Sequence, residues 1–261
     1  MNLKEKYTID DLIAILKRLR EPDGCPWDRV QTHQSIKKSM IEETYEAIDA
    51  LDFGDDKAFA NELGDVLLQV VFHSELADER GAFNFDDVVK EVCVKLITRH
   101  SHVFGDDKAD NEAEALDNWE KNKKKEKQIA SYTGVLSDVP KYLPALMRAE
   151  KVQKKAKKVG FDWPDMSGAL DKLCEELVEF QEALDEKDPD HIEEEFGDLL
   201  FAAVNAARFA GVDPEKALHR SCVKFINRFR YLEDAARAEG RDLETMTLEE
   251  MDALYEEAKK R

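Results

Sequence analysis

An internal repeat is the feature of this sequence that most restricts its fold. Residues 42–46 (EETYE) return as EELVE 133 positions later, and residues 62–67 (ELGDVL) return as EFGDLL at the same spacing. Five acidic positions therefore recur without an insertion or deletion between them. Two basic residues and one aromatic residue match at slightly different spacings: Lys95, Arg99 and Trp119 with Lys224, Arg228 and Tyr255. A repeat of this length predicts two copies of one structural unit.

Turn-forming residues mark the boundary between the copies. After the basic run of residues 121–127, residues 131–134 read SYTG, and prolines follow at Pro140 and Pro144. Such residues interrupt helices, so we expect a linker without a helix here. The sequence therefore predicts an N-terminal domain at 1–128, a linker at 129–140 and a C-terminal domain at 141–261, with a further loop at 105–111.

Within each copy the apolar residues recur with the period of a helix. Residues 35–53 and 56–76 carry this pattern, and another helix begins at Asn84. Thr8 begins a capping box before the first helix, and Asp213 starts a late helix of the second copy. With 11 Gly and 7 Pro in 261 residues, the chain has too few turn residues for a many-stranded sandwich or barrel. We therefore expect an all-α protein of two tandem helical bundles, with about four main helices each.

The composition limits the partners and the location of the chain. Asp and Glu number 58 against 39 Lys and Arg, a net charge of −19. Nucleic-acid binding draws on positive surface, so no nucleic acid is expected as a partner. The N-terminus lacks the apolar core of a signal peptide, and the most apolar stretch, residues 199–210, is too short to span a membrane. Four scattered cysteines without a CxxC pair indicate reduced thiols and a cytoplasmic location.

Four carboxylates of the second copy form a candidate metal site. Side chains three or four positions apart share a helix face, so Glu176 and Glu179 project together, as do Glu195 and Asp198 one helix later. The turn at residues 188–190 makes these helices antiparallel neighbours. Opposed carboxylates repel one another and favour a hard cation, Mg²⁺ with Mn²⁺ as a substitute, and no nearby His or Cys indicates zinc. The competing interpretation is a solvated helix face; the apolar neighbours and the recurrence of the acids argue against it.

Basic and aromatic residues supply candidate contacts for an anionic ligand. Lys224 and Arg228 lie one helical turn apart and could clamp phosphate oxygens, and Lys172 lies one turn before Glu176. The basic pair fits an ordinary helix surface equally well. Tyr255 could stack on a base, although an aromatic residue in an amphipathic terminal helix is more often part of a core.

The acidic pattern resembles a known signature. EE-x-x-E followed shortly by E-x-G-D on the next helix is similar to the MazG signature of all-α nucleoside triphosphate pyrophosphohydrolases. The resemblance covers nearly the whole chain and includes residues 25–28 (CPWD), 99–104 (RHSHVF), 143–146 (LPAL) and 160–163 (GFDW). It implies the all-α NTP pyrophosphatase fold and Mg²⁺-dependent hydrolysis of nucleoside triphosphates to monophosphate and pyrophosphate. It also implies a homodimer that cleans or regulates the nucleotide pool.

The resemblance assigns roles residue by residue. The metal ligands would be Glu176, Glu179, Glu195 and Asp198. The residues that meet the nucleotide would be Lys172, Glu175, His191, Ile192, Glu193, Glu194, Lys224, Arg228 and Tyr255. A secondary site in the first copy would contain Glu42, Glu43, Glu46, Glu62, Asp65, Lys95, Arg99 and Trp119. The chain departs from the family at Ser101, where Pro is frequent, and at Tyr255, where Trp is frequent, which leaves base stacking open.

Hydrolysis between the α- and β-phosphates needs an aimed water and support for the leaving pyrophosphate. Mg²⁺ would neutralise the polyphosphate, and the basic residues would stabilise the leaving oxygens. Glu175 is the candidate catalytic group that orients or deprotonates the water, or else a further metal ligand. We expect the second copy to carry most of the turnover, because Ser39 stands where the second copy has Lys172.

Three other interpretations remain. A non-catalytic nucleotide sensor or interaction module would share the ligand site without turnover. A related pyrophosphohydrolase would differ only in its substrate, such as phosphoribosyl-ATP. A di-iron bundle oxidase also places carboxylates on facing helices, but such proteins supply Glu-x-x-His where this chain has Glu62-x-x-Asp65 and Glu195-x-x-Asp198.

Overall fold

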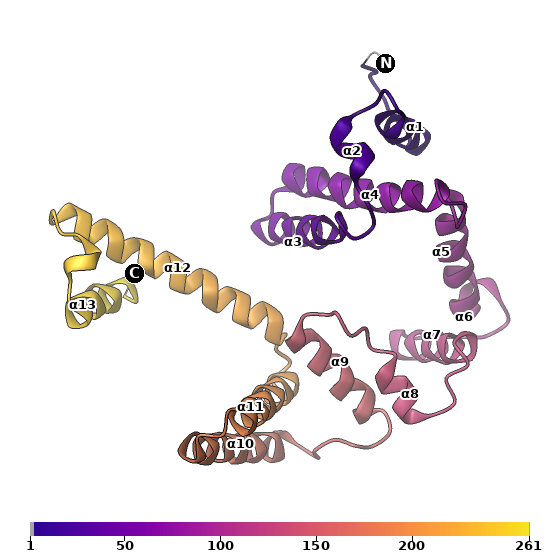
Figure 1. Cartoon of the computed structure of the whole chain (residues 1–261). Helices are drawn as coiled ribbons and strands as arrows, with labels where there is room; N and C mark the ends of the chain where they lie inside the picture. The colour runs from indigo at the N-terminus through magenta and orange to yellow at the C-terminus, as the bar shows by residue number, and fades with distance from the viewer. Residues whose placement is uncertain (1–2, 261) are drawn as a thin grey trace. The chain divides into compact units, whose positions relative to one another are not determined.

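The structure is a computed structural model that describes residues 3–260 of the chain (Figure 1). Within that range it contains the α-helices α1 to α13, a short 3₁₀ helix and no strand, which confirms the prediction of an all-α protein. The chain divides into two compact units, the first ending at Glu126 and the second beginning at Lys127. None of the described helices combines the length and the apolar character that a bilayer crossing requires.

The first unit contains α1 to α7. Their bounds are Ile9–Arg20 (α1), Pro26–Val30 (α2), Lys37–Phe53 (α3), Asp56–Asp78 (α4), Phe85–Arg99 (α5), Ser101–Phe104 (α6) and Glu112–Glu126 (α7). Thr8 caps α1 and Asn84 caps α5, each through a capping box in which side chain and backbone bond reciprocally. The helices predicted at 35–53 and 56–76 are α3 and α4, so this part of the sequence prediction is confirmed.

A small apolar core joins α1 to α4. Leu16 of α1 is buried in one cluster with Val71, Phe72 and Leu76 of α4, and Ile36 joins it from just before α3. Burying a side chain of this kind stabilises a fold by about 1.5–3 kcal/mol. This cluster therefore fixes the first helix of the unit against the helix that carries the ELGD motif.

The second unit contains α8 to α13. Their bounds are Tyr132–Ser137 (α8), Ala145–Lys157 (α9), Met166–Glu186 (α10), Pro189–Phe209 (α11), Pro214–Ala238 (α12) and Leu248–Ala258 (α13), with the 3₁₀ helix at Leu243–Thr245. The prediction of a linker without a helix is wrong, because α8 lies inside residues 129–140. Ser131 caps α8 by accepting a hydrogen bond from the Gly134 N–H, and α8 packs against α9. Asp213 caps α12 as predicted.

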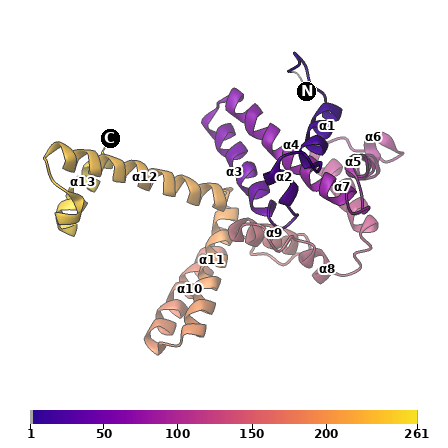
Figure 2. The same ribbon diagram turned by 45° about the horizontal axis from the view of Figure 1, so that its top comes forward.

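Two helix hairpins position the acidic motifs. α3 and α4 lie side by side in the first unit, and α10 and α11 do so in the second (Figures 1 and 2). Gly54 ends α3 in the left-handed region, at a φ of 74°. Lys187 ends α10 in the same region, and Asp188 caps α11 with Pro189 at its first position. Since each connection is only a few residues long, the paired helices run antiparallel and their faces oppose, as the sequence predicts.

Candidate active site

The α10–α11 hairpin gathers three of the four predicted metal ligands. Each of Glu176, Glu179 and Glu195 has a carboxylate oxygen within 4.8 Å of the others'. Asp198, one turn beyond Glu195 on α11, is exposed and does not join this group. It lines the same pocket as Glu176, however, so the fourth predicted ligand lies at the edge of the cluster. We call Glu176, Glu179, Glu195 and Asp198 the second acidic cluster.

Glu176 is the most buried member of this cluster. Its exposed fraction is 5%, and its Oε2 atom has no hydrogen-bond partner among the residues that the structure describes. Its other oxygen, Oε1, lies 2.7 Å from the Lys172 ammonium. A buried carboxylate with one unsatisfied oxygen is costly, so this position calls for a further positive partner.

Lys172 lies among the carboxylates of α10. Its Nζ atom is 2.6 Å from Glu175 Oε1, 2.7 Å from Glu176 Oε1 and 3.8 Å from Glu179 Oε2. The hydrogen bonds to Glu175 and Glu176 raise the pKa of Lys172 above its ordinary value. Desolvation raises the pKa of Glu179, and repulsion from the neighbouring carboxylates raises it further. Lys172 is thus the internal counter-charge of the cluster.

The predicted segment 191–194 begins next to the cluster and then leaves it. His191 places Nδ1 2.8 Å from Glu186 Oε2 and Nε2 3.2 Å from Glu195 Oε1, and the hydrogen bond to Glu186 raises the pKa of His191. Ile192 is half-buried. Glu193 and Glu194 are exposed on the first turns of α11, and neither belongs to the group of convergent carboxylates.

The first copy forms a matching acidic group on α3 and α4. Carboxylate oxygens of Glu43, Glu62 and Asp65 lie within 4.8 Å of one another. Burial raises the pKa of Glu43, and repulsion from Asp65 and Glu46 raises it further. Glu46 is exposed and outside the group, and Glu42 pairs instead with Lys38 at 3.0 Å.

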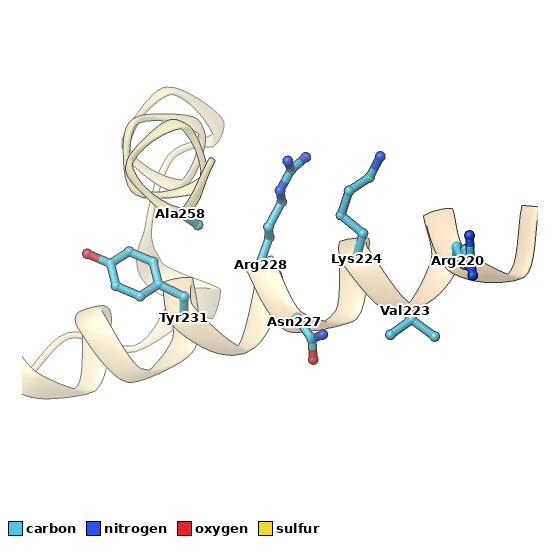
Figure 3. Close-up of a pocket in the computed structure, with 7 residues that line it drawn as sticks. All are labelled: Arg220, Val223, Lys224, Asn227, Arg228, Tyr231 and Ala258. Carbon is cyan, nitrogen blue, oxygen red and sulfur yellow. The ribbon is translucent and has the colours of Figure 1, made fainter. Parts of the chain in front are cut away.

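The basic pair of the second copy lines a separate pocket. Lys224 and Arg228 border a pocket of about 410 Å³, and Figure 3 shows their side chains extending in the same direction from α12. This pocket shares no lining residue with the one that contains Glu176. Tyr255 of α13 lies against Arg228 and Phe225 rather than in the pocket wall. Its ring centre is 5.8 Å from that of Phe225, and the Arg228 guanidinium lies 5.8 Å from the same centre.

The corresponding residues of the first copy are engaged within their own unit. Arg99 forms a two-pronged ion pair with Glu126, with Nε 2.8 Å from Oε2 and Nη2 2.9 Å from Oε1. The same guanidinium lies 5.3 Å from the Trp119 ring centre, so the predicted arginine and aromatic residue meet in the contact between α5 and α7. Lys95 pairs with Glu91 along α5 at 3.9 Å.

Sequence reasoning missed a pocket beside the second acidic cluster. This pocket of about 510 Å³, which we call the α9–α11 pocket, has Lys172, Glu176 and Asp198 in its wall. Side chains from α9, α11 and the segment before α10 complete it, among them Gln153, Trp163, Asn205 and Arg208. One signal was visible in the sequence, because Asn205 and Arg208 interrupt the most apolar stretch of the chain.

The chemistry of the two acidic groups is that of a site for a hard cation. Carboxylate oxygens converge from two helices, and the described residues of each group include no cysteine or histidine ligand. Such a cation can in turn bridge to phosphate oxygens. The fold and the site together define a class: a tandem all-α protein with a carboxylate centre in each repeat.

Comparison with known proteins identifies the family within this class. The chain matches the MazG nucleotide pyrophosphohydrolase domain twice, at residues 31–104 and 166–232. It is 46% identical over 252 residues to the nucleoside triphosphate pyrophosphohydrolase/pyrophosphatase MazG of Thermotoga maritima, covering 96% of this chain and 95% of that protein. The nucleoside triphosphate pyrophosphohydrolase of Escherichia coli K12 is 42% identical over 255 residues, 97% of each chain. The chain belongs to the MazG family of hydrolases, which confirms the resemblance seen in the sequence.

A longer relative contains a stretch similar to nearly the whole of this chain. The uncharacterized protein YabN of Bacillus subtilis is 49% identical to this chain over 247 residues. The match covers 94% of this chain but only 50% of that protein. Both copies of the repeat therefore occur together in proteins of different length.

Proposed function

We propose that this chain hydrolyses nucleoside triphosphates to nucleoside monophosphate and pyrophosphate, as the names of its relatives in Thermotoga maritima and Escherichia coli describe for those proteins. The observation that carries the proposal is the convergence of Glu176, Glu179 and Glu195 beside a pocket large enough for a nucleoside. The role that fits such an activity is cleaning or regulation of the nucleotide pool.

We propose Mg²⁺ as the metal of the site, with Mn²⁺ as a substitute. Three observations support the fit: oxygen-only donors, their mutual distances within 4.8 Å, and the unpartnered Oε2 of Glu176 in the described chain. Glu176, Glu179, Glu195 and Asp198 would hold the ion. When bound, Mg²⁺ supplies positive charge for the polyphosphate and lowers the pKa of a coordinated water.

The side chains of the second copy would carry the remaining steps. Glu175, which is exposed and adjoins the cluster, orients a water toward the α-phosphorus and accepts its proton. The new bond forms between the water oxygen and the α-phosphorus, and the bond from this phosphorus to the oxygen bridging to the β-phosphate breaks. Lys172 would turn from the carboxylates to the phosphate chain and stabilise the charge on the departing pyrophosphate. Lys224 and Arg228 line a separate pocket in the single chain, so their contact with the pyrophosphate stays a prediction from the sequence.

We assign most of the turnover to the second copy. Ser39 of the first copy stands 133 positions before Lys172, so the first acidic group lacks that cation. Arg99, the counterpart of Arg228, forms an ion pair with Glu126. The first copy is then a structural, regulatory or weakly active partner of the second.

The experiment is a comparison of matched double variants. Glu195→Ala with Asp198→Ala should lower pyrophosphate release by about 100-fold or more, because it removes half of the ligand set. Glu62→Ala with Asp65→Ala should leave release within a few-fold of wild type. Each protein is assayed with Mg²⁺ on a panel of standard and damaged nucleoside triphosphates, after circular dichroism has confirmed its fold. If instead the first-copy variant loses pyrophosphate release and the second-copy variant keeps it, the active site lies in the first copy. If the wild-type chain releases no pyrophosphate from any triphosphate, the proposed hydrolysis is wrong and a non-catalytic nucleotide sensor is favoured.

We also propose a homodimer. Large apolar side chains stay exposed on both hairpins of the single chain, including Tyr45, Ile48 and Leu51 on α3 and Leu177 and Val178 on α10. A second copy of the chain would cover them. Sedimentation equilibrium should give twice the mass of one chain, and a monomeric mass at micromolar concentration would contradict this proposal.

A cytoplasmic location is proposed from the cysteines. Cys25 is half-buried, Cys93, Cys174 and Cys222 are exposed, and all four are free thiols. Free exposed thiols are typical of reducing compartments. Cell fractionation with an antibody to the chain tests the location directly.

A further inference from the structure

Two histidines of the first unit share one hydrogen bond. His33 lies in residues 31–36, which we call the α2–α3 segment, and His73 lies on α4. Their Nδ1 atoms are 2.9 Å apart, and the ring planes are within 5° of parallel. Because 2.9 Å is shorter than the about 3.5 Å at which ring faces pack, the rings meet through their Nδ1 edges. A bond between two imidazole nitrogens needs one proton, so one Nδ1 donates and the other accepts.

The far side of the His33 ring limits how this pair can be protonated. Its Nε2 atom is buried and has no hydrogen-bond partner among residues 3–260. In the neutral pair this nitrogen can stay without a proton: His33 donates from Nδ1, and His73 accepts and carries its own proton on Nε2. The neutral pair is therefore compatible with its surroundings.

A further proton is not compatible with them. The bond exists only while one of the two Nδ1 atoms is protonated, so an added proton that keeps the bond requires protons on both Nε2 atoms. On His33 this would be a buried N–H without an acceptor, in a pair that has also become positively charged. Protonation on the Nδ1 side instead places two N–H groups against each other. Acid therefore weakens the attachment of His33 to His73 by either route.

The charges around α4 do not offset this effect. Burial lowers the pKa of His73 below its ordinary 6.5, and His33 lowers it further, with no other charged group of the described chain adding to these causes. α4 packs against α1, α3 and α5. The charged side chains of these helices that reach it meet other partners: Lys17 and Arg20 of α1 lie against Glu75, Asp78 and Glu79, Glu43 of α3 lies near Glu62 and Asp65, and Asp87 of α5 accepts from the Asn84 N–H.

The α2–α3 segment is attached to α4 by one polar and one apolar side chain. Ile36, at its end, is 3% exposed and lies in the core cluster with Leu16 and Phe72. Within the segment, the Thr32 N–H donates to Ser35 Oγ at 2.8 Å, and the Ile36 N–H donates to the Thr32 carbonyl at 3.2 Å. Since the apolar contact of Ile36 does not change with pH, the histidine pair determines how pH affects the segment.

We propose that the His33–His73 pair is an acid-sensitive latch, which holds the α2–α3 segment on α4 at neutral pH and releases it when the pair is protonated. The segment leads directly into α3, so its release loosens the start of that helix. The latch is specific to the first copy, because Met166 and Ala206 stand at the corresponding positions of the second copy, 133 residues later. The proposal does not depend on the proposed hydrolysis.

The first test measures amide hydrogen exchange of the full-length chain, corrected for the intrinsic exchange rate at each pH. Between about pH 7.5 and about pH 5.5, the protection of residues 32–36 should fall about 5-fold or more, because one bound proton shifts an opening equilibrium by up to about 10-fold per pH unit. The protection of α10 in the second unit should change less than about 2-fold over the same range. Equal protection of the segment at both pH values, or loss of protection in the segment and α10 together, would overturn the latch.

Matched variants connect the effect to the pair. His33→Asn and His73→Asn each keep a side-chain amide near the Nδ1 position, which can donate or accept as the remaining histidine requires, so both should stay protected at both pH values. His33→Ala removes the bond and should give low protection at both. His219→Asn removes an exposed imidazole of α12 and should behave as wild type. Asn variants that lose protection in acid as wild type does would assign the effect to another group and refute the proposal.

A second measurement on the unaltered chain covers the case in which the variants do not fold. Nitrogen-detected NMR of the imidazole rings should show one protonated Nδ1 in the pair at about pH 7.5, and both rings should titrate together below the ordinary 6.5 as the segment loses protection. Two independent titrations near 6.5, with neither Nδ1 protonated in the neutral state, would show that the bond does not hold the segment.

Discussion

Replacing Lys172 by methionine should have opposite effects on metal binding and on catalysis. The ammonium lies 2.6 and 2.7 Å from Glu175 and Glu176, and these hydrogen bonds raise its pKa, so it is charged at neutral pH. It therefore neutralises the carboxylates that a divalent cation would use. Methionine keeps an unbranched apolar side chain of nearly the same length and removes the charge, so the cation should meet a more negative site.

The size of the effect follows from Coulomb's law and the exposure of the side chain. Two unit charges about 4 Å apart interact by about 4 kcal/mol at an effective dielectric constant of about 20. The Lys172 side chain is 36% exposed, so water and salt screen this interaction. A discounted value of about 1–2 kcal/mol corresponds to about 5- to 30-fold tighter Mg²⁺ binding in Lys172→Met. Hydrolysis should fall, because the phosphate contact is lost.

Isothermal titration calorimetry with Mg²⁺, in the absence of nucleotide and at fixed ionic strength, measures the first effect. Pyrophosphate release measures the second. Lys151→Met on α9 removes the same charge at an exposed position with no part in the cluster, and it should change neither quantity. Unchanged or weaker Mg²⁺ binding by Lys172→Met would refute the idea that this ammonium shares the carboxylates with the metal.

Three further outcomes are expected. Mg²⁺ at about 100 times its dissociation constant should add about 2.7 kcal/mol to the free energy of unfolding, seen as a higher Tm than in EDTA and lost in the double variant of the second cluster. Burial and the nearby His33 hold the pKa of His73 below its ordinary 6.5, so the unfolded chain binds this proton more tightly than the folded chain does. The free energy of unfolding should therefore fall as the pH drops below about 6.5, by at most about 1.4 kcal/mol per pH unit. Urea titrations of His73→Gln should show a weaker dependence of this free energy on pH. Gly168→Ala should displace the Trp163 ring and change its fluorescence, whereas unchanged fluorescence would show that the ring tolerates the extra methyl group.

Most helices could be predicted because their signals are local. Thr8, Asn84 and Asp213 cap helices where the sequence places them, and the periodicity of residues 35–53 and 56–76 gives α3 and α4. α8 escaped prediction for a local reason too. Its first residues read as a turn in SYTG, but the Ser131 side chain accepts a hydrogen bond from the Gly134 N–H, and α8 packs against α9, which also favours the helix.

Only the part of the candidate site that lies within one helix hairpin could be predicted from the sequence. Glu176, Glu179 and Glu195 converge because helix spacing and a short turn bring them together, and both are readable from sequence. The α9–α11 pocket depends on how a helix far away in sequence packs against α11, which periodicity does not specify. Asn205 and Arg208 were visible as polar residues in an apolar helix, but their partners were not.

The two copies also differ in what their interiors are used for. In the first, Leu16, Val71 and Phe72 pack together between α1 and α4, beside a small pocket whose wall includes Lys17 and Glu75. In the second, Asn205 and Arg208 occupy the positions that correspond to Phe72 and Glu75, and both line the α9–α11 pocket. The second unit buries apolar side chains of its own, among them Val204 and Leu232, and places Asn205 and Arg208 in a pocket wall next to its carboxylates.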